Sequence, residues 1–520
     1  MSAQPIAAGA RRAERSRAIR AGPALVAGAA LAVALGASPA RSQTFRMVPS
    51  MEVTGSWSDN VDPTNGQPPQ SSWLTELIPG IRIDLAGARV KALVDARLNY
   101  LDYARAAHLD RTERYLNSFV KVEAVENWLF LDVRANIDQE NRSAFGAPAT
   151  PGASVANRNR VEATTYQAAP YIRGLISDVA AYQLRFNETS VHANDPLTPD
   201  TRMSEWAGRL TSPLAKIGWT LDARGVNVRN GLVGSLDDSR VRGSLSYAFD
   251  SDIRVSLSEG YEATDFAGPP RRTGQTPGAG LEWSPGPRTQ FSGVYEKRFF
   301  GAGHSVLFTH RTPLTAWRLA STKDATVLPE QLAANGPFSI EGLMSDLLTS
   351  AIRDPVERAQ AVRRRLEETG IGGTSVLGSD VLTTRPFVVR ETTASFALLG
   401  AINTMAFTAT SKEQRNFGDA ISLPALVGDE DFRQTGFDAN LAHKLTPLTV
   451  LTLTATSWRT QSLVVAARRS RQQVYTLFIT TQLSPRTSAS LGFRRTDFVG
   501  TADLQSYREN VVFGTVTIRM

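Results

Sequence analysis

Hydrophobic and polar residues alternate one by one over long stretches of the chain. Between residues 90 and 100, Val, Ala, Leu and Tyr take the even positions, and between residues 129 and 137, Leu, Val, Ala and Ile take the odd ones. A period of two places each set on one face of an extended strand. The opposite faces carry charged side chains, namely Lys91, Asp95, Arg97, Asp132, Arg134 and Asp138. Each segment therefore predicts a β-strand with one dry and one wet face.

The predicted strands are longer than those of an ordinary soluble sheet. The alternating runs last about 10 to 16 residues, whereas strands of globular proteins typically stop near 5 or 6. A strand that crosses a bilayer at a tilt needs about 9 to 11 residues. Tight turns, such as residues 85–89 and 312–315, alternate with longer polar loops, such as residues 58–72 and 146–157. Short turns on one side and long loops on the other are typical of outer-membrane barrels.

The predicted fold class is all-β: a transmembrane antiparallel β-barrel of roughly 22 strands with one helical loop insertion. An even number of strands places both termini in the periplasm. A closed barrel has no free edge, so the last strand, at residues 507–520, is expected to pair with the first, near residues 50–59.

The charged side chains on the wet faces are expected to line the lumen. A Lys or Arg that faced lipid at the midplane would cost about 2 to 4 kcal/mol, so the six residues of the two segments above should point inward. A lumen of mixed charge fits two alternatives, a water-filled passage and a plugged interior held by ion pairs. Aromatic residues near strand ends are expected to form girdles at the membrane interfaces. They are Trp57, Trp73, Tyr103, Trp128, Trp219, Trp283, Trp317 and Trp458.

One segment departs from the alternation. Residues 326–384 are predicted to form a helical loop insertion on the side of the long loops. Asp354 is the expected N-cap of a helix, Pro355 its first residue, and Glu357 completes a box-like pattern. Leu366 belongs to a set of apolar residues at helical spacing. Such an insertion can cap the barrel mouth, fold inward as a plug or gate, or remain a solvated surface excursion.

The amino terminus has the pattern of a secretory signal peptide. Residues 1–42 combine six Arg and one Glu with an Ala-rich apolar run and small residues before the expected cut. The barrel is therefore expected to span residues 43–520, to follow the Sec export route and to reside in the bacterial outer membrane. Removing a segment of net charge +5 from a chain of net charge +7 leaves +2, which offers no footprint for nucleic acid.

Composition and motif spacing argue against other classes of protein. Hydrophobic residues are 42% and charged residues 21% of the chain, which does not suit a bundle of membrane helices of about 20 apolar residues each. Cysteine is absent, which excludes disulfides and thiolate chemistry. We expect no metal, no cofactor and no enzymatic activity, because the histidines stand singly and without the spacing of metal ligands. They are His108, His192, His304, His310 and His443.

Three stretches of the chain resemble a known family. They are PSMEVTGSWSDNV at residues 49–61, ELIPGIRIDLAG at residues 76–87 and DPVERAQAVRRRLEETGI at residues 354–371. They are similar to the outer-membrane β-barrel proteins associated with the PEP-CTERM system, and the similarity extends over essentially the whole mature chain. The resemblance implies a barrel encoded beside exosortase and exopolysaccharide biosynthesis genes, with a part in envelope or polysaccharide export.

The function predicted from the sequence is a passive channel or secretion component linked to exopolysaccharide or envelope export. A hydrophilic lumen would lower the barrier for polar solutes, and the insertion would gate it. A non-conducting barrel that docks a periplasmic or surface partner is one alternative, and a barrel hydrolase with a spatially assembled histidine site is another. Expected partners are outer-membrane lipid, the barrel assembly machinery and, from the resemblance, exopolysaccharide or its export proteins.

Overall fold

The computed structural model describes residues 44–520 apart from several gaps. The gaps fall at residues 64–67, 149–156, 158, 197, 214, 232–233, 334–343, 346–347, 350–351, 353, 370–380, 418–430, 502–503 and 505. The predicted signal peptide, residues 1–42, lies outside the described residues. Neither α-helix in the described part of the chain is long and apolar enough to cross a membrane.

The described chain is almost entirely antiparallel sheet. Its strands are β1 (Thr44–Ser58), β2 (Ser72–Ala86), β3 (Val90–Tyr103), β4 (Arg111–Val125), β5 (Leu129–Asn141), β6 (Arg160–Ile176), β7 (Ala180–Ala193), β8 (Thr201–Thr211), β9 (Ile217–Asn230), β10 (Gly234–Ala248), β11 (Ile253–Thr264), β12 (Arg272–Gln275), β13 (Gly278–Gly286), β14 (Thr289–Arg298), β15 (Gly301–Arg311), β16 (Thr315–Thr326), β17 (Phe387–Leu399), β18 (Asn403–Asn416), β19 (Phe432–Thr446), β20 (Thr449–Ser462), β21 (Arg469–Ser484), β22 (Thr487–Gly500) and β23 (Tyr507–Arg519). The helices are α3 (Leu328–Ala333), α5 (Pro355–Thr369) and the 3-10 helix η1 (Ala107–Leu109).

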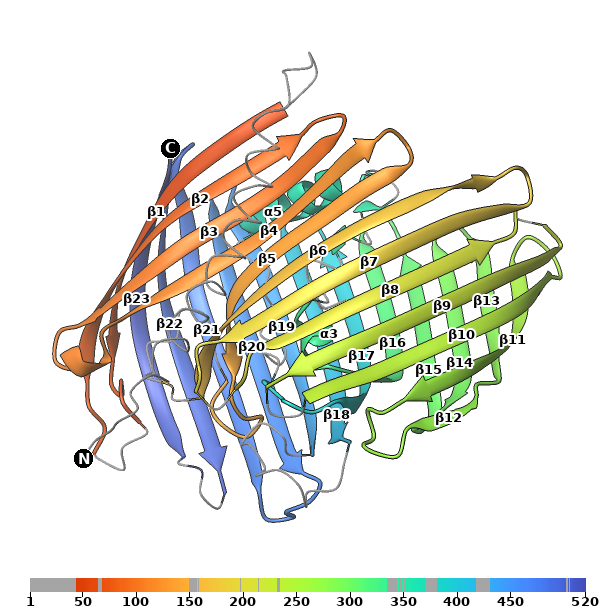
Figure 1. Ribbon diagram of the computed structural model, residues 1–520. Helices are drawn as coiled ribbons and strands as arrows, with labels where there is room; N and C mark the ends of the chain where they lie inside the picture. The colour runs from red at the N-terminus through yellow and green to blue at the C-terminus, as the bar shows by residue number, and fades with distance from the viewer. Residues whose placement is uncertain are drawn as a thin grey trace, which may run out of the picture.

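The sheet closes on itself as a barrel of 22 strands (Figure 1). Neighbouring strands pair antiparallel in sequence order, and β12 and β13 act as one strand because both pair with β11. Closure comes from β1 and β23, which pair from Ser50 opposite Arg519 to Ser58 opposite Val511. The predicted fold class, the strand number and the pairing of the last strand with the first are confirmed.

The two ends of the barrel differ in their connections. At the end where β1 begins and β23 ends, every turn between consecutive strands is two to five residues long. At the opposite end lie the long connections, including residues 142–159, 327–386 and 417–431. Outer-membrane barrels have short turns in the periplasm and long loops outside. The short-turn end is therefore the periplasmic end, and the long-loop end is called the surface end below.

Large apolar side chains cover the outside of the barrel. Leu245, Leu257 and Leu491 are 60%, 68% and 68% exposed, as lipid-facing positions of a barrel are. The predicted girdle residues Trp57, Trp73, Trp128, Trp219, Trp283 and Trp317 are also exposed. The girdle prediction is wrong for Tyr103 and Trp458, which are 2% and 5% exposed, because both fall on the inward-facing set of positions of their strands.

Candidate functional site: an occupied, charged lumen

The three charged residues predicted on β3 take part in ion pairs on the inner wall. Asp95 accepts two hydrogen bonds of 2.9 Å from Arg97 and lies 3.4 Å from Arg82 on β2. Lys91, which is nearer the periplasmic end, forms an ion pair with Asp354 of the insertion. One predicted lumen residue therefore meets one predicted insertion residue directly.

The three charged residues predicted on β5 also contact other elements or their own backbone. Asp132 lies 3.1 Å from Arg185 on β7. The Arg134 guanidinium donates a hydrogen bond of 3.3 Å to the carbonyl oxygen of Ala333, the last residue of α3. The Asp138 carboxylate accepts a hydrogen bond of 2.8 Å from the backbone N–H of the next residue. β5 thus contributes one ion pair across the wall and one contact with the insertion.

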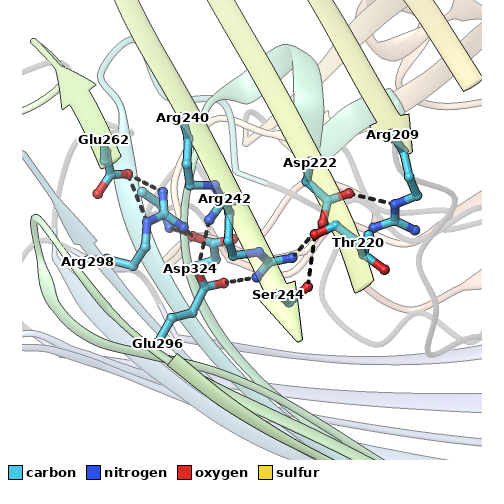
Figure 2. Close-up of polar contacts among 11 residues, drawn as sticks. Arg209, Thr220, Asp222, Arg240, Arg242, Ser244, Glu262, Glu296, Arg298 and Asp324 are labelled. Carbon is cyan, nitrogen blue, oxygen red and sulfur yellow. Dashed lines mark hydrogen bonds and ion pairs between the residues drawn. The ribbon is translucent and has the colours of Figure 1, made fainter. Parts of the chain in front are cut away.

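A larger ion-pair network covers the inner wall between β8 and β16 (Figure 2). Its members are four arginines and four carboxylates, namely Arg209, Asp222, Arg240, Arg242, Glu262, Glu296, Arg298 and Asp324. The network faces the lumen because the alternate residues of β10, Val241 and Leu245, are exposed apolar side chains on the outside. Positive and negative members are equal in number, so the network is polar but has no net charge.

The centre of this network is almost fully enclosed. The side chains of Arg298 and Glu262 are 5% and 2% exposed, and Arg298 donates to Glu262 at 2.8 Å and 2.5 Å. Arg298 also donates to Asp324 at 2.9 Å. Removing one partner of such a buried pair leaves an uncompensated charge, which typically costs about 3 to 5 kcal/mol. Arg298 therefore ties β11, β14 and β16 together on the lumen side.

The insertion between β16 and β17 begins and ends against the inner wall at the surface end. α3 contacts β6, β7 and β8. The buried apolar cluster at this contact contains Val161, Ala163, Val191, Ala193, Leu328 and Leu382. Leu382 belongs to the returning end of the insertion, and its backbone N–H donates to the Asn141 carbonyl oxygen at 2.9 Å. Both ends of the insertion are thus held at the same side of the barrel.

A second polar contact holds α3 to the wall. Arg224 on β9 lies between two carboxylates, 2.6 Å from Glu205 on β8 and 2.7 Å from Glu330 on α3. The Thr326 hydroxyl donates to Glu330 at 3.0 Å. Burial raises the pKa of the Glu330 carboxyl, although the Arg224 guanidinium acts in the opposite direction. Two carboxylates share one guanidinium here, so the cluster has a net charge of −1 when both carboxylates are ionised.

The second helix of the insertion, α5, lies at the periplasmic end of the barrel (Figure 1). It contacts β2 and β3 on either side of a short turn. The helix begins at Pro355, and the Asp354 carboxylate caps it by accepting a hydrogen bond of 3.0 Å from the backbone N–H of Glu357. The same carboxylate pairs with Lys91. Asp354 therefore shapes the helix and attaches it to the wall.

An apolar contact completes the attachment of α5. Met344, Val362 and Leu366 of the insertion pack with Ala406 of β18 and Ala442 of β19, and each of the five is at most 3% exposed. Small alanine side chains on the inner wall let the helix approach closely. The described parts of the insertion therefore occupy the lumen at both of its ends, α3 and Leu382 at the surface end and α5 at the periplasmic end; together they are called the plug below.

Two features of this site were not predicted from the sequence. The inward-facing positions of β6 and β7 turn apolar toward the surface end, at Val161, Ala163, Val191 and Ala193, which is where α3 covers them. An apolar stretch on an otherwise polar face is a signal that could have located the plug contact. The network around Arg298 has no comparable signal, because its members lie on six different strands.

The five histidines are scattered among different partners. His108 lies 3.5 Å from Asp62, His192 lies 2.5 Å from Asp200, His304 lies 3.1 Å from Ser321, His310 lies 2.9 Å from Thr289 and His443 lies 2.7 Å from Asn403. None of these contacts joins a hydroxyl, a histidine and a carboxylate in one set. In the part of the chain that the structure describes, no group of three or more His, Cys, Asp or Glu side chains could hold a metal ion.

Fold and site together define the class of protein. A closed 22-strand barrel with an apolar exterior and a charged interior is an outer-membrane β-barrel, and its place is the bacterial outer membrane. Its lumen holds a loop of the same chain.

Comparisons with known proteins do not assign the chain to a narrower class than outer-membrane β-barrels. No protein-family model and no curated protein sequence matches it. Among solved structures, the siderophore receptor PirA from Pseudomonas aeruginosa is 8% identical, with 92% of this chain and 81% of that chain covered and a TM-score of 0.43. PirA from Acinetobacter baumannii is 7% identical, with 92% and 81% covered and a TM-score of 0.47. The FrpB iron transporter from Neisseria meningitidis, as apoprotein, is 9% identical, with 91% and 81% covered and a TM-score of 0.48. Likenesses at this level assign no substrate to this chain.

Proposed function

We propose that the protein is a gated passage through the outer membrane, with the insertion as its gate, that serves the export of exopolysaccharide or another envelope polymer. The placement of the described parts of the insertion is the observation that carries this proposal. Both ends of the segment lie at the surface end, and α5 lies at the periplasmic mouth. A segment placed in this way obstructs the lumen, and its withdrawal would not unpair any two strands of the barrel.

The attachments of the insertion are weaker than those of the wall. Among its described residues, backbone pairing with the barrel is limited to one isolated bridge, between Val381 and Asn141. α5 is held by the Lys91–Asp354 ion pair and by the small cluster around Leu366. Neighbouring barrel strands, in contrast, are joined by continuous ladders of backbone pairs, as between β5 and β6 from Leu129 opposite Ile172 to Asn141 opposite Arg160. Elements with few buried contacts are those that open first.

A polar cargo is inferred from the chemistry of the inner wall. The lumen is lined by ion pairs and hydrogen-bonding side chains, as in the network around Arg298 and Arg242. Such a surface solvates polar solutes and offers little to apolar ones. The link to exopolysaccharide draws on the resemblance of three sequence stretches to barrels of the PEP-CTERM system.

Single-channel conductance of the reconstituted protein tests the gate. The test compares the full chain with a variant in which residues 334–380 are replaced by a Gly/Ser linker. Ala333 and Val381, the residues to be joined, contact β5 at Arg134 and Asn141, seven positions or roughly 23 Å apart. A linker of about 12 residues spans this distance with slack. We expect the full chain to be mostly closed and the variant to conduct steadily.

Two alternatives would show different outcomes in the same experiment. If neither protein passes ions, a docking barrel that holds a periplasmic or surface partner replaces the passage. This alternative draws on the ion pairs that bind the plug to the wall at both ends. A barrel hydrolase would instead show turnover that is lost when one histidine, such as His310, is replaced by Asn.

A further inference from the structure

Five arginines line a cavity at the periplasmic mouth. It has a volume of about 280 Å³ and lies between α5 and the seam where β1 meets β23, with β2, β21 and β22 completing its wall. Its charged lining residues are Arg46, Arg82, Asp84, Arg363, Arg364 and Arg519. They converge from the two terminal strands, the second strand and the insertion.

The charged residues that line this cavity differ in balance from those of the network between β8 and β16. In the network between β8 and β16, four arginines face four carboxylates. Among the described residues that line the cavity, five are arginines and one is a carboxylate, Asp84; Arg82 also lies 3.4 Å from Asp95. Guanidinium groups therefore converge on this cavity at the mouth that faces the periplasm. A recess lined by one sign of charge raises the local concentration of ligands of the opposite sign.

We infer that this cavity binds the carboxylate of an acidic sugar unit. Guanidinium groups present planar pairs of N–H donors that match a carboxylate, and they recognise it more specifically than ammonium groups do. The remaining polar lining residues supply hydroxyl and amide groups suited to sugar hydroxyls, namely Gln360, Thr480, Gln482 and Ser488. Val48 is the sole apolar side chain among the lining residues, so a neutral apolar ligand finds little to contact.

The cavity and the gate share an element. Gln360, Arg363 and Arg364 of α5 are three and four residues apart and so lie on one face of the helix. Val362 and Leu366 of the same helix pack on β18 and β19. An acidic polymer that arrives from the periplasm therefore meets the gate itself. The ligand would be the polymer exported under the proposed function, and the role of the site rests on that function.

Binding can be measured without any conduction. The experiment is titration calorimetry of the full chain in a neutral detergent with three probes: an oligogalacturonate of defined length, a neutral maltooligosaccharide of the same length, and inorganic phosphate. The test variant is Arg363→Gln/Arg364→Gln. The matched control is Arg459→Gln/Arg471→Gln, which removes two charges from paired, exposed positions of β20 and β21 away from the cavity. Far-ultraviolet circular dichroism verifies that both variants keep the sheet.

We expect the oligogalacturonate to bind the wild type and the control alike. The test variant should bind it about tenfold or more weakly, as the loss of charge-assisted hydrogen bonds implies. Added salt should weaken binding, and the neutral oligosaccharide should not bind. Failure of oligogalacturonate to bind, an equal loss in the control, or equally tight binding of phosphate would overturn the assignment. If the protein binds the acidic probe but never conducts, the binding site stands and the proposed passage fails. If it conducts but does not bind the probe, the passage stands and the binding site fails.

Discussion

The ion pair between Lys91 and Asp354 should control how often the lumen opens. The two side chains are 27% and 24% exposed. The pair therefore lies between exposed ion pairs, which contribute about 0 to 1 kcal/mol, and enclosed ones, whose disruption costs about 3 to 5 kcal/mol. We take its contribution to the docking of α5 as about 1 to 2 kcal/mol, which corresponds to a roughly 5- to 30-fold change in the ratio of docked to undocked insertion.

The substitutions can be chosen to remove the pair and little else. Asp354→Asn keeps the N-cap, because Asn caps helices about as well as Asp, but it removes the charge. Lys91→Met keeps most of the apolar stem. In planar bilayers at low salt, either variant should raise the frequency of opening about 5- to 30-fold over the wild type. The double variant should add little to either single one, because both remove the same interaction.

Salt provides an independent control of the same reasoning. The opening frequency of the wild type should rise between 0.1 M and 1 M KCl, because the screening length shortens from about 10 Å to 3 Å. Both single variants should respond less. If Lys91→Met and Asp354→Asn open as rarely as the wild type, while the variant without residues 334–380 conducts, the pair does not hold the gate. Effects of the two substitutions that simply add would also refute the reasoning.

Three further predictions concern the apolar contact, the buried network and the α3 cluster. Leu366→Ala should loosen α5 by about 2 to 5 kcal/mol and raise the opening frequency more than either charge variant, with an unchanged denaturation midpoint of the barrel. Arg298→Met should lower the free energy of unfolding of the barrel by about 3 to 5 kcal/mol in guanidinium titrations, whereas Arg209→Met, at a side chain that is 63% exposed, should cost less than about 1 kcal/mol. The pKa of Glu330 is raised when α3 is docked, so the protonated carboxyl favours the docked state. This stabilisation of docking is complete below the ordinary pKa of 4.5 and is lost as pH rises through the raised pKa. Comparison with Glu330→Gln at each pH isolates this effect, because the amide mimics the protonated carboxyl: the opening frequency of the wild type relative to that of the variant should fall toward one on acidification.

Much of the barrel is readable in local patterns. The alternation between residues 90 and 100 places Lys91, Asp95 and Arg97 on one face, and the observed contacts of all three lie on the inner wall. The same rule fails for Tyr103 and Trp458, because an aromatic residue near a strand end was assigned to a girdle without regard to its face. Whether an aromatic residue faces lipid or the lumen depends on its odd or even position along the strand, and the residue type alone does not decide it.

The insertion illustrates the opposite case. The cap at Asp354 and the start of α5 at Pro355 follow from a few neighbouring residues, because a helix end is satisfied locally. Whether the helix lies outside, over or within the barrel depends on contacts with strands far away in the sequence. The insertion packs on the apolar inward positions near Val191 and on Ala406 and Ala442. These residues form an inner surface only after the barrel has closed, so the sequence pattern does not reveal them as contact sites.

The sequence by itself determined the strands, their two faces and the helix of the insertion, because each follows from the short-range geometry of the backbone. The pairing of β1 with β23 could be predicted as well, because a closed barrel leaves no free edge. Only the tertiary structure decided which charges meet. Lys91 and Asp354 are 263 residues apart, and Arg298 joins carboxylates from two other strands. The alternation of a strand sets the side to which a residue points but not its height or its opposite neighbour, which depend on the stagger of the closed barrel and on the path of the plug inside it.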